Sequence, residues 1–408
     1  MRQRFPWLSK AARLLSLAAV VSANVPLAAQ AAAPTSAPPL PTWSGPLQPQ
    51  ERDERGLWML SNDDEQLLKS SRFLITDRAL NDYVRGVLCK TVGQDRCGAV
   101  RLYIMRVPAF NASMSPNGMM QIWSGALLRM HSEAELAAVL GHEFAHYEQR
   151  HSLAGFKQAR SASDAAVWMS FIPIAGLALS LGALQGYFQY NQQQETAADL
   201  GGFAFLEQAG YRTGAFANVW ERLISEDDAA RVARGQKAKG GRRSGFFATH
   251  PASADRMAYL RALATKAGDR GDEGAADYRA GLGPWTGQFF ADQLKLNDFG
   301  GTEWLLADMA KTAGWTADLL TARGDLYRLR GLPGDMAAAA GFYREALTKG
   351  DANPETRRGL GLALLRQGQQ AEGATLLKSY LDLKPDASDA AMLRMMAGLP
   401  TTSTGPDK

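Results

Sequence analysis

Two histidines and a glutamate in the middle of the chain have the types and spacing of a metal site. His142 and His146 are four residues apart, so on a helix their side chains lie about 40° apart in rotation and about 6 Å apart along the axis. Both rings can then reach one ion. Glu143 lies about 100° around the same helix, where its carboxylate can contact a metal-bound water without being a ligand. This is the HExxH arrangement, in which the histidines bind zinc and the glutamate is the general base.

The chance of a random match is small, because the chain holds only five histidines. The alternative is a helix with two exposed histidines. A metzincin would need Gly and His where Gln149 and Ser152 stand, so that class of protease is excluded. His151 follows His146 by five residues, about 140° around a helix, which favours a packing or surface residue over a ligand.

A better third ligand lies downstream. Glu195 and Asp199 are again four residues apart, so one helix face offers a metal ligand and an acceptor for a histidine N–H.

Together these motifs resemble the HtpX/Oma-type gluzincin family of zinc metalloproteases, and among them the BepA-like exported members with tetratricopeptide repeats. The resemblance covers roughly residues 70–265. It is carried by Asn111 with Ala112, by residues 134–146, by residues 195–199, and by residues 249–251 followed by Arg256.

The resemblance implies a site with defined roles. Zinc would be bound by His142, His146 and Glu195, with Glu143 as base and Asp199 orienting a ligand. The strand with Asn111 and Ala112 would pair with an extended substrate backbone.

His250 and Arg256 are candidates for contacts to the oxyanion or the substrate. His250 has two further interpretations. It could occupy the open zinc position in a resting state, or pack at a helix start before Pro251.

The surrounding pattern predicts the elements that position these residues. Apolar residues at helical spacing predict a helix over 77–88, and alternation predicts strands over 99–107 and 119–123, joined through a turn at 115–118. Ser132 and Glu135 form a capping box at the start of the HExxH helix. We therefore expect an α+β, mainly helical fold with a zincin-type catalytic domain and a small β-sheet.

The chain begins with a targeting signal. Four basic residues and no acidic ones precede or flank an apolar run in residues 1–31, which predicts a secretory signal peptide cleaved near Ala31. Outside it, 41 basic residues balance the 41 acidic ones, so no overall field favours nucleic acid.

Residues 32–50 hold six prolines and predict an extended linker, with the fold beginning near residue 51. In an oxidising compartment Cys89 and Cys97 could form a disulfide; the alternative is two buried thiols.

Between Asp164 and Glu195 there are 30 consecutive uncharged residues. A single membrane span would place His146 and Glu195 on opposite sides of about 30 Å of hydrocarbon, which one zinc site forbids. Glycines, a proline and glutamines break up the segment, so we favour a buried or cleft-flanking helical hairpin. A peripheral membrane contact through residues 165–190 is the alternative.

The basic stretch 231–244 lacks interleaved aromatic residues and predicts a solvated loop, not a nucleic-acid site.

The C-terminal part predicts paired helices. Small and aromatic residues in 324–354 and 360–385 fit tetratricopeptide spacing, which places a helical repeat domain at 286–398 after a protease domain at 51–267. Such stacks present a concave face for protein segments, although two repeats make only a short groove.

These features predict a periplasmic zinc endopeptidase, with one Zn²⁺ per chain. The family implies misfolded or misassembled envelope proteins as substrates and a role in outer-membrane protein quality control. The repeats would dock substrate or a partner such as the outer-membrane assembly machinery. The alternative is a chaperone or adaptor whose zinc site is structural or silent.

Overall fold

The structure is a computed structural model that describes residues 36–161, 190–240, 250, 254–350 and 353–400. The predicted signal peptide, and nearly all of the uncharged insert and its predicted hairpin, lie outside the described residues. Within them, no helix combines the length and the hydropathy needed to cross a bilayer.

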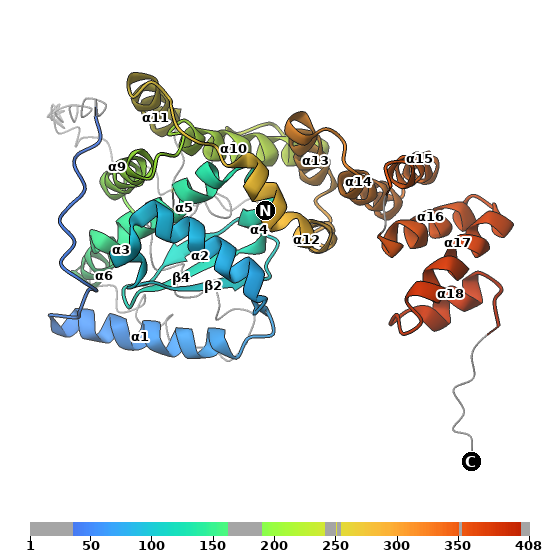
Figure 1. Ribbon diagram of the computed structural model, residues 1–408, viewed down its shortest axis with the longest axis horizontal. Coiled ribbons are helices and arrows are strands. Elements are labelled where there is room, and N and C mark those ends of the chain that lie inside the picture. The colour runs from blue at the N-terminus through green and yellow to red at the C-terminus, as the bar shows by residue number, and fades with distance from the viewer. Residues whose placement is uncertain (1–35, 162–189, 241–249, 251–253, 351–352, 401–408) are drawn as a thin grey trace, which may run out of the picture. The chain divides into compact units, whose positions relative to one another are not determined.

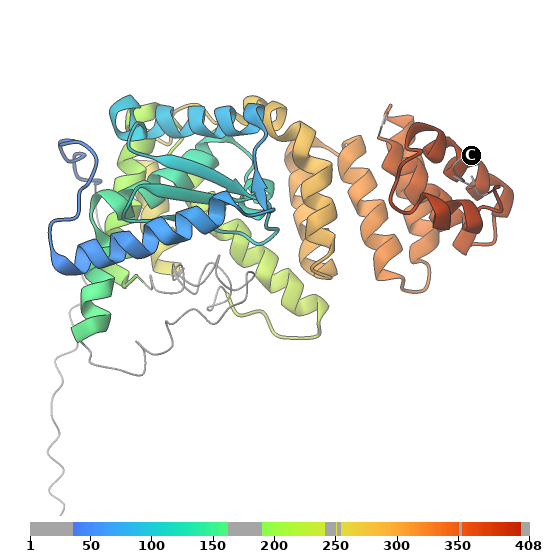
Figure 2. The same cartoon turned by 90° about the horizontal axis from the view of Figure 1, so that it is seen from below.

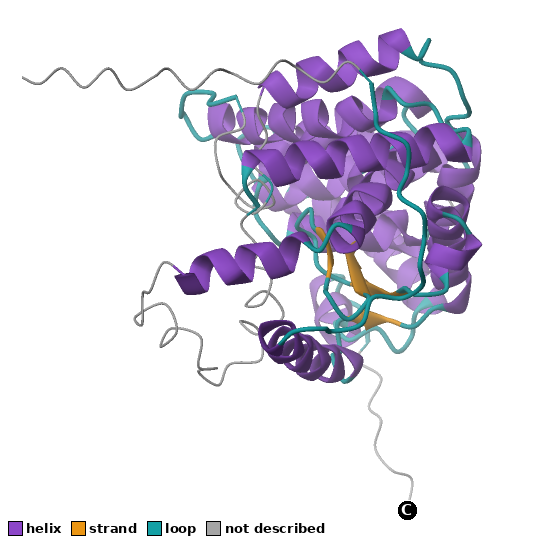
Figure 3. Ribbon diagram, turned by 90° about the vertical axis from the view of Figure 1, so that its left-hand side faces the viewer, coloured by secondary structure: helices purple, strands orange, loops and turns teal. Residues whose placement is uncertain are grey.

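Helices dominate the described chain, and one small mixed sheet lies among them (Figure 3). Its strands are β1 (Leu74–Ile75), β2 (Arg101–Met105), β3 (Ala112–Met114) and β4 (Met119–Trp123), in the spatial order β1-β2-β4-β3. β2 and β4 are parallel, whereas β1 and β3 run antiparallel to their neighbours. This arrangement leaves β3 as an edge strand. The predicted α+β, mainly helical fold is confirmed.

The two faces of the sheet are covered by different helices (Figures 1 and 2). On one face, Ile104 and Ile122 belong to the main core with residues of α2 (Arg78–Val92) and α5 (Glu133–Glu148). On the other, Met105 and Met119 pack with Leu68 of α1 (Arg52–Lys69). Side chains alternate between faces along a strand, so β2 contributes to both layers.

The predicted turn at 115–118 also forms, but it joins β3 to β4 and not the two central strands β2 and β4. Ser115 N–H donates to the Met119 carbonyl, and Gly118 N–H donates to the Ser115 carbonyl. Gly118 has φ of +87°, and a Cβ there would lie 2.6 Å from the carbonyl oxygen of Ala99. Only glycine fits this position without strain.

The two cysteines are joined in a disulfide. Cys89 lies in α2 and Cys97 ends the short helix α3 (Gln94–Cys97), with Cα atoms 4.9 Å apart. The bond ties the end of α2 to the segment that enters β2.

Residues 36–50 contain no helix or strand, as expected of a proline-rich segment, yet they lie on the domain. Trp43 packs 5.8 Å from the ring of Phe144 in α5, and Arg96 lies over the Trp43 ring. The Leu47 N–H donates to the Tyr147 hydroxyl. The expectation that the fold begins near residue 51 is therefore corrected, because apolar side chains of this segment cover the core.

The remaining helices fall into two groups. Around the centre lie α4 (Ser124–Arg129), α6 (His151–Ser161), α9 (Gln192–Ala209), α10 (Ala215–Ala233) and α11 (Ala254–Lys266). They are followed by α12 (Ala275–Leu294), α13 (Phe299–Ala313), α14 (Ala317–Arg330), α15 (Asp335–Thr348), α16 (Pro354–Arg366), α17 (Gln370–Leu383) and α18 (Ala390–Met396).

The C-terminal helices pack through small residues. A Cβ at Gly324 would lie 2.6 Å from the Tyr343 ring, and one at Gly361 would lie 2.9 Å from Leu377. The tetratricopeptide assignment itself stays a prediction. Residue 286, where the repeat domain was expected to begin, falls inside the continuous helix α12, and Tyr278 and Phe289 of α12 belong to the main core. The described chain has no break at that point.

Candidate metal centre

The HExxH helix, α5, is fixed at its start and buried along its length. The Ser132 hydroxyl accepts from the Glu135 N–H at 3.2 Å, as predicted. The second half of the capping box differs, because the Glu135 carboxylate accepts from the N–H of His131 instead of Ser132. His142, Glu143 and His146 are all buried.

Small residues bring α9 against α5. A Cβ at Gly201 would lie 2.7 Å from the Ala145 Cβ, and one at Gly202 would lie 3.1 Å from the backbone nitrogen of His142. Asn191 and Gln194 form a complete capping box at the start of α9. The close crossing places Glu195 and Asp199 beside the two histidines.

Four potential ligand atoms meet between these helices. The Nε2 atoms of His142 and His146 are 3.1 Å apart, and His142 Nε2 lies 3.3 Å from His250 Nδ1. Glu195 Oε1 is 3.0 Å from His250 Nδ1 and 3.5 Å from His146 Nε2. Donors about 2.0 to 2.1 Å from a tetrahedral zinc would stand about 3.3 Å apart. The spacing and the three-nitrogen, one-oxygen donor set therefore fit a zinc-sized ion.

The Nδ1 atom of each of the two α5 histidines, which points away from the ligand cluster, contacts a neighbouring side chain. His142 Nδ1 lies 3.1 Å from Asp199 Oδ1. His146 Nδ1 lies 2.9 Å from His151 Nδ1, and the Tyr190 ring stacks on His146 with centroids 3.8 Å apart. Burial, together with the nearby His142 and His250 rings, lowers the pKa of His146 well below its ordinary value. A neutral ring is the form that binds a metal.

Arg256 holds the carboxylates from behind. Its Nε and one terminal nitrogen donate to the two oxygens of Asp199 at 2.7 Å each, and Nη1 lies 2.5 Å from Glu195 Oε2. The Tyr259 hydroxyl also bonds to Asp199. Although burial opposes it, the pKa of Asp199 is lowered below its ordinary range by Arg256 and His142. Asp199 is thus an anion that can accept from His142.

Glu143 faces the same cluster without being one of its closest members. Its Oε1 lies 3.7 Å from His250 Nε2 and has no hydrogen-bond partner among the described residues. Burial raises the pKa of Glu143, and a backbone hydrogen bond from Met114 of β3 opposes that rise. A buried carboxylate with one free oxygen is suited to taking up a proton.

Asn111 and Ala112 lie at the edge of the sheet. The Asn111 carbonyl accepts from the Trp123 N–H at 3.0 Å, and Ala112 begins β3 opposite Ile122. Because Met114 of the same strand bonds to Glu143, the sheet edge passes directly beside the cluster.

The structure thus brings together His142, His146, Glu195 and His250 as a possible ligand group, with Glu143, Asp199 and Arg256 around it. Three further residues contact these side chains, namely His151, which the spacing predicted to be a packing or surface residue, and Tyr190 and Tyr259, for which the sequence predicted no role. The aromatic residues stand in apolar surroundings typical of a core, so their type and spacing carry no signal of a site.

Comparison with known proteins agrees with this geometry. Residues 77–264 match the model of Peptidase family M48. The mitochondrial metalloendopeptidase OMA1 of Schizosaccharomyces pombe is 33% identical over 38% of this chain and 44% of its own. The metalloprotease LoiP of Escherichia coli is 31% identical over 37% of this chain and 57% of its own. The beta-barrel assembly-enhancing protease of Escherichia coli is 26% identical over 48% of this chain and 41% of its own. The chain spans about half the length of these relatives. The predicted resemblance to this family of metalloproteases is confirmed, whereas the tetratricopeptide repeats stay a prediction.

Proposed function

Because residues 77–264 match the model of Peptidase family M48, we propose that this chain is a zinc endopeptidase of the bacterial envelope. The observation that carries the proposal is the meeting of four ligand atoms beside a buried carboxylate with a free oxygen.

His142, His146 and Glu195 would hold the zinc ion. Zinc bound by such donors lowers the pKa of a water molecule and polarises a carbonyl group. Glu195 would ligate through Oε1, since its Oε2 is engaged by Arg256 at 2.5 Å. Asp199 would orient His142 through Nδ1 and thereby fix which nitrogen faces the metal.

Glu143 is the proposed general base. It would accept a proton from the attacking water at Oε1 and return that proton to the departing amine as the peptide bond breaks. Its free oxygen and its raised pKa support both halves of this transfer.

His250 and Arg256 take different roles in this proposal. His250 Nδ1 lies among the ligand atoms, which supports the interpretation that His250 occupies the fourth position at rest and withdraws for substrate. Arg256 donates to two carboxylates, which supports a positioning role in place of a contact to the oxyanion. Asn111 and Ala112, at the start of the edge strand β3, would pair with the extended backbone of the substrate.

The proposed substrates are misfolded or misassembled envelope proteins. The name of the beta-barrel assembly-enhancing protease supports this class, as does the predicted signal peptide in residues 1–31. The C-terminal helices α14 to α17 would dock substrate or an assembly partner.

The experiment is to purify the mature chain, count its zinc, and compare cleavage of casein with that by Glu143→Gln. We expect one zinc in both proteins and cleavage only by the wild-type protein. Zinc in both with no Glu143-dependent cleavage of any unfolded client would favour the adaptor instead.

A further inference from the structure

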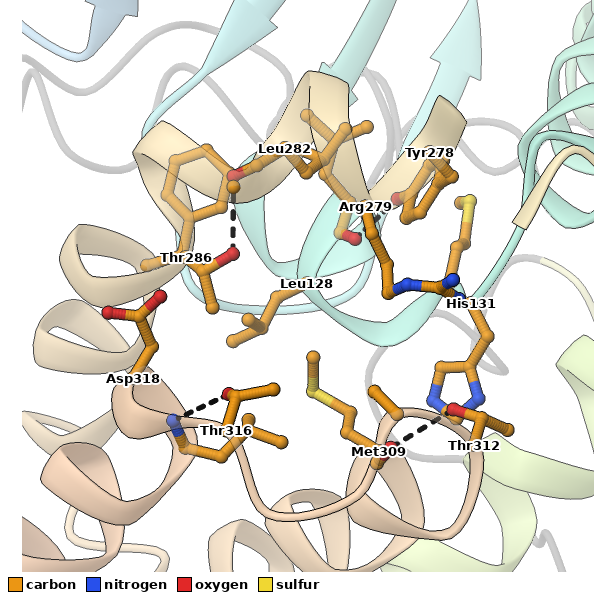
Figure 4. Close-up of a pocket in the computed structure, with 16 residues that line it drawn as sticks. Leu128, His131, Tyr278, Arg279, Leu282, Thr286, Met309, Thr312, Thr316 and Asp318 are labelled. Carbon is orange, nitrogen blue, oxygen red and sulfur yellow. Dashed lines mark hydrogen bonds between the residues drawn. The ribbon is translucent and has the colours of Figure 1, made fainter. Parts of the chain in front are cut away.

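A cavity of about 170 Å³ lies away from the metal centre, between α4, α12, α13 and α14. Its wall is mainly apolar. Figure 4 shows Leu128, Leu282 and Met309 around the space, with Arg279 and His131 at one end and Asp318 at the other. The neighbouring wall includes Leu127, Phe289 and Leu319.

The size of the cavity limits what can enter it. An apolar protein cavity of about 150 Å³ holds one benzene molecule. A cavity of about 170 Å³ therefore has room for one aromatic or branched aliphatic side chain, but not for a long acyl chain. The rest of a larger ligand must stay outside, where Arg279 is exposed.

One end of the cavity is lined by two polar side chains, those of His131 and Arg279. The His131 side chain is 10% exposed, and its Nε2 has no hydrogen-bond partner among the described residues. The nearest acid, Asp308, has an oxygen 3.6 Å away, which is too long for a hydrogen bond. Burial, assisted by Arg222, lowers the pKa of His131 to about 4, so the ring is neutral at pH 7 and keeps one N–H donor.

Arg279 supplies the charge. It lines the cavity and makes no ion pair with an acid within the part of the chain that the structure describes. By contrast, Arg129 and Arg222 nearby are paired with Glu226 and Glu135. An unpaired guanidinium beside an apolar cavity is complementary to a carboxylate attached to an apolar group.

We propose that this cavity binds the carboxyl-terminal residue of a polypeptide, with its large apolar side chain inside and its carboxylate beside Arg279 and His131. A polypeptide end unites the three required features, namely one apolar side chain, one adjacent carboxylate, and a chain that continues into solvent. The proposal goes beyond the proposed protease activity and does not depend on it.

The site is separate from the metal centre. The wall residues of α4 and His131 directly precede Ser132, which caps α5. His142 lies ten residues further along that helix, about 15 Å along its axis. A client could therefore be held by its end here while another segment of it lies at the sheet edge.

The test measures peptide binding by fluorescence anisotropy in the full mature chain with Glu143→Gln, so that the probe is not cleaved. The probe is a labelled peptide ending in Gly-Ser-Gly-Phe, as the free acid and as the C-terminal amide. We expect the acid to bind and the amide to bind at least about tenfold more weakly, because the amide loses a charged hydrogen bond. Arg279→Gln should lower the affinity for the free-acid peptide to that for the amide. Arg366→Gln, which changes another exposed arginine, should leave that affinity unchanged.

A second variant fills the cavity. A Cβ at Gly283 would meet nothing within 4 Å, so Gly283→Leu can place its side chain in the cavity while favouring the helix. It should abolish binding. Gly341→Leu is the matched control, because Gly341 is equally unobstructed in α15 and lies outside the cavity.

Several results would overturn the proposal. They are equal affinity for acid and amide, no binding of the acid at millimolar concentration, or unchanged binding in Gly283→Leu. Binding of octanoate at Arg279 without binding of the peptide would assign the site to a free fatty acid and would equally reject it. If Gly283→Leu fails to fold, the comparison of acid with amide in the unaltered cavity still decides.

Discussion

The Nδ1 atom of His151 lies 2.9 Å from the Nδ1 atom of His146, and both rings are buried. Only one of two facing nitrogens can carry the proton. If His146 binds metal through Nε2, its Nδ1 carries a proton and donates it to His151. His151 would then fix the orientation of a ligand without touching the metal.

We therefore predict that His151→Ala lowers zinc affinity by about tenfold to a hundredfold, as loss of a partner behind a ligand usually does. The measurement is competition with a chromophoric chelator. His131→Ala removes a ring far from the cluster and should leave affinity unchanged. Equal zinc affinity in His151→Ala and the wild-type protein would mean that the contact only fills space.

The crossing of α5 and α9 depends on Gly201. Gly201→Ala would bring its Cβ to 2.7 Å from the Ala145 Cβ, which separates the helices and costs about 1 to 3 kcal/mol of unfolding free energy. Because Glu195 moves with α9, zinc affinity should fall as well. Adding Ala145→Gly should restore zinc affinity, and Gly155→Ala, which meets nothing within 4 Å, is the control. If the free energy of unfolding and the zinc affinity of Gly201→Ala both equalled those of the wild type, the close crossing of α5 and α9 would be refuted.

Glu65 should make stability depend on pH. Burial raises its pKa, but hydrogen bonds from Arg101 and Tyr103 outweigh burial and lower it from 4.5 to about 2. A carboxylate with a lowered pKa in the folded state stabilises above its unfolded pKa, and that contribution is lost as the pH falls from about 4.5 towards 2.

The expected result is that Glu65→Gln loses about 2 kcal/mol of unfolding free energy at pH 7, since charged hydrogen bonds are replaced by neutral ones. The difference from wild type should shrink at pH 3.5. Urea unfolding at both pH values measures it. Glu221→Gln, in an exposed pair with Arg261, should cost less than about 1 kcal/mol. A Glu65→Gln deficit that stays constant down to pH 3 would show that the lowered pKa is wrong.

The spacing alone could predict only the local parts of the candidate site, whereas the meeting of Glu195 and His250 with the HExxH helix was an expectation of the family resemblance. A spacing of four residues on a helix brings His142 and His146 together whatever surrounds them, and their Nε2 atoms lie 3.1 Å apart. Apolar residues at helical spacing likewise predicted the helix over 77–88, and alternation of apolar and polar residues predicted the two central strands. The edge strand β3 has only three residues, too few for alternation to be read.

His151 illustrates what a local pattern cannot provide. On a continuous helix the His151 ring would lie about 140° around from His146, but α5 ends at Glu148 and Arg150 has φ of +53°. The chain therefore turns before α6, and the ring of His151 comes back to His146. Such contacts depend on where a helix stops, which periodicity defines poorly.

The proline-rich segment shows the same limit from another side. Its composition correctly excludes helix and strand, but composition says nothing about whether an extended chain packs on a surface. Trp43 packs against Phe144 and Arg96, and the positions of these two residues depend on the folded domain.

The account rests on a metal ion held between α5 and α9, and an anomalous difference map of the mature protein recorded at the zinc edge tests it most directly. We predict one peak, about 2 Å from His142 Nε2, His146 Nε2 and Glu195 Oε1. A map without a peak among these three atoms, or with its peak at other residues, would contradict the account.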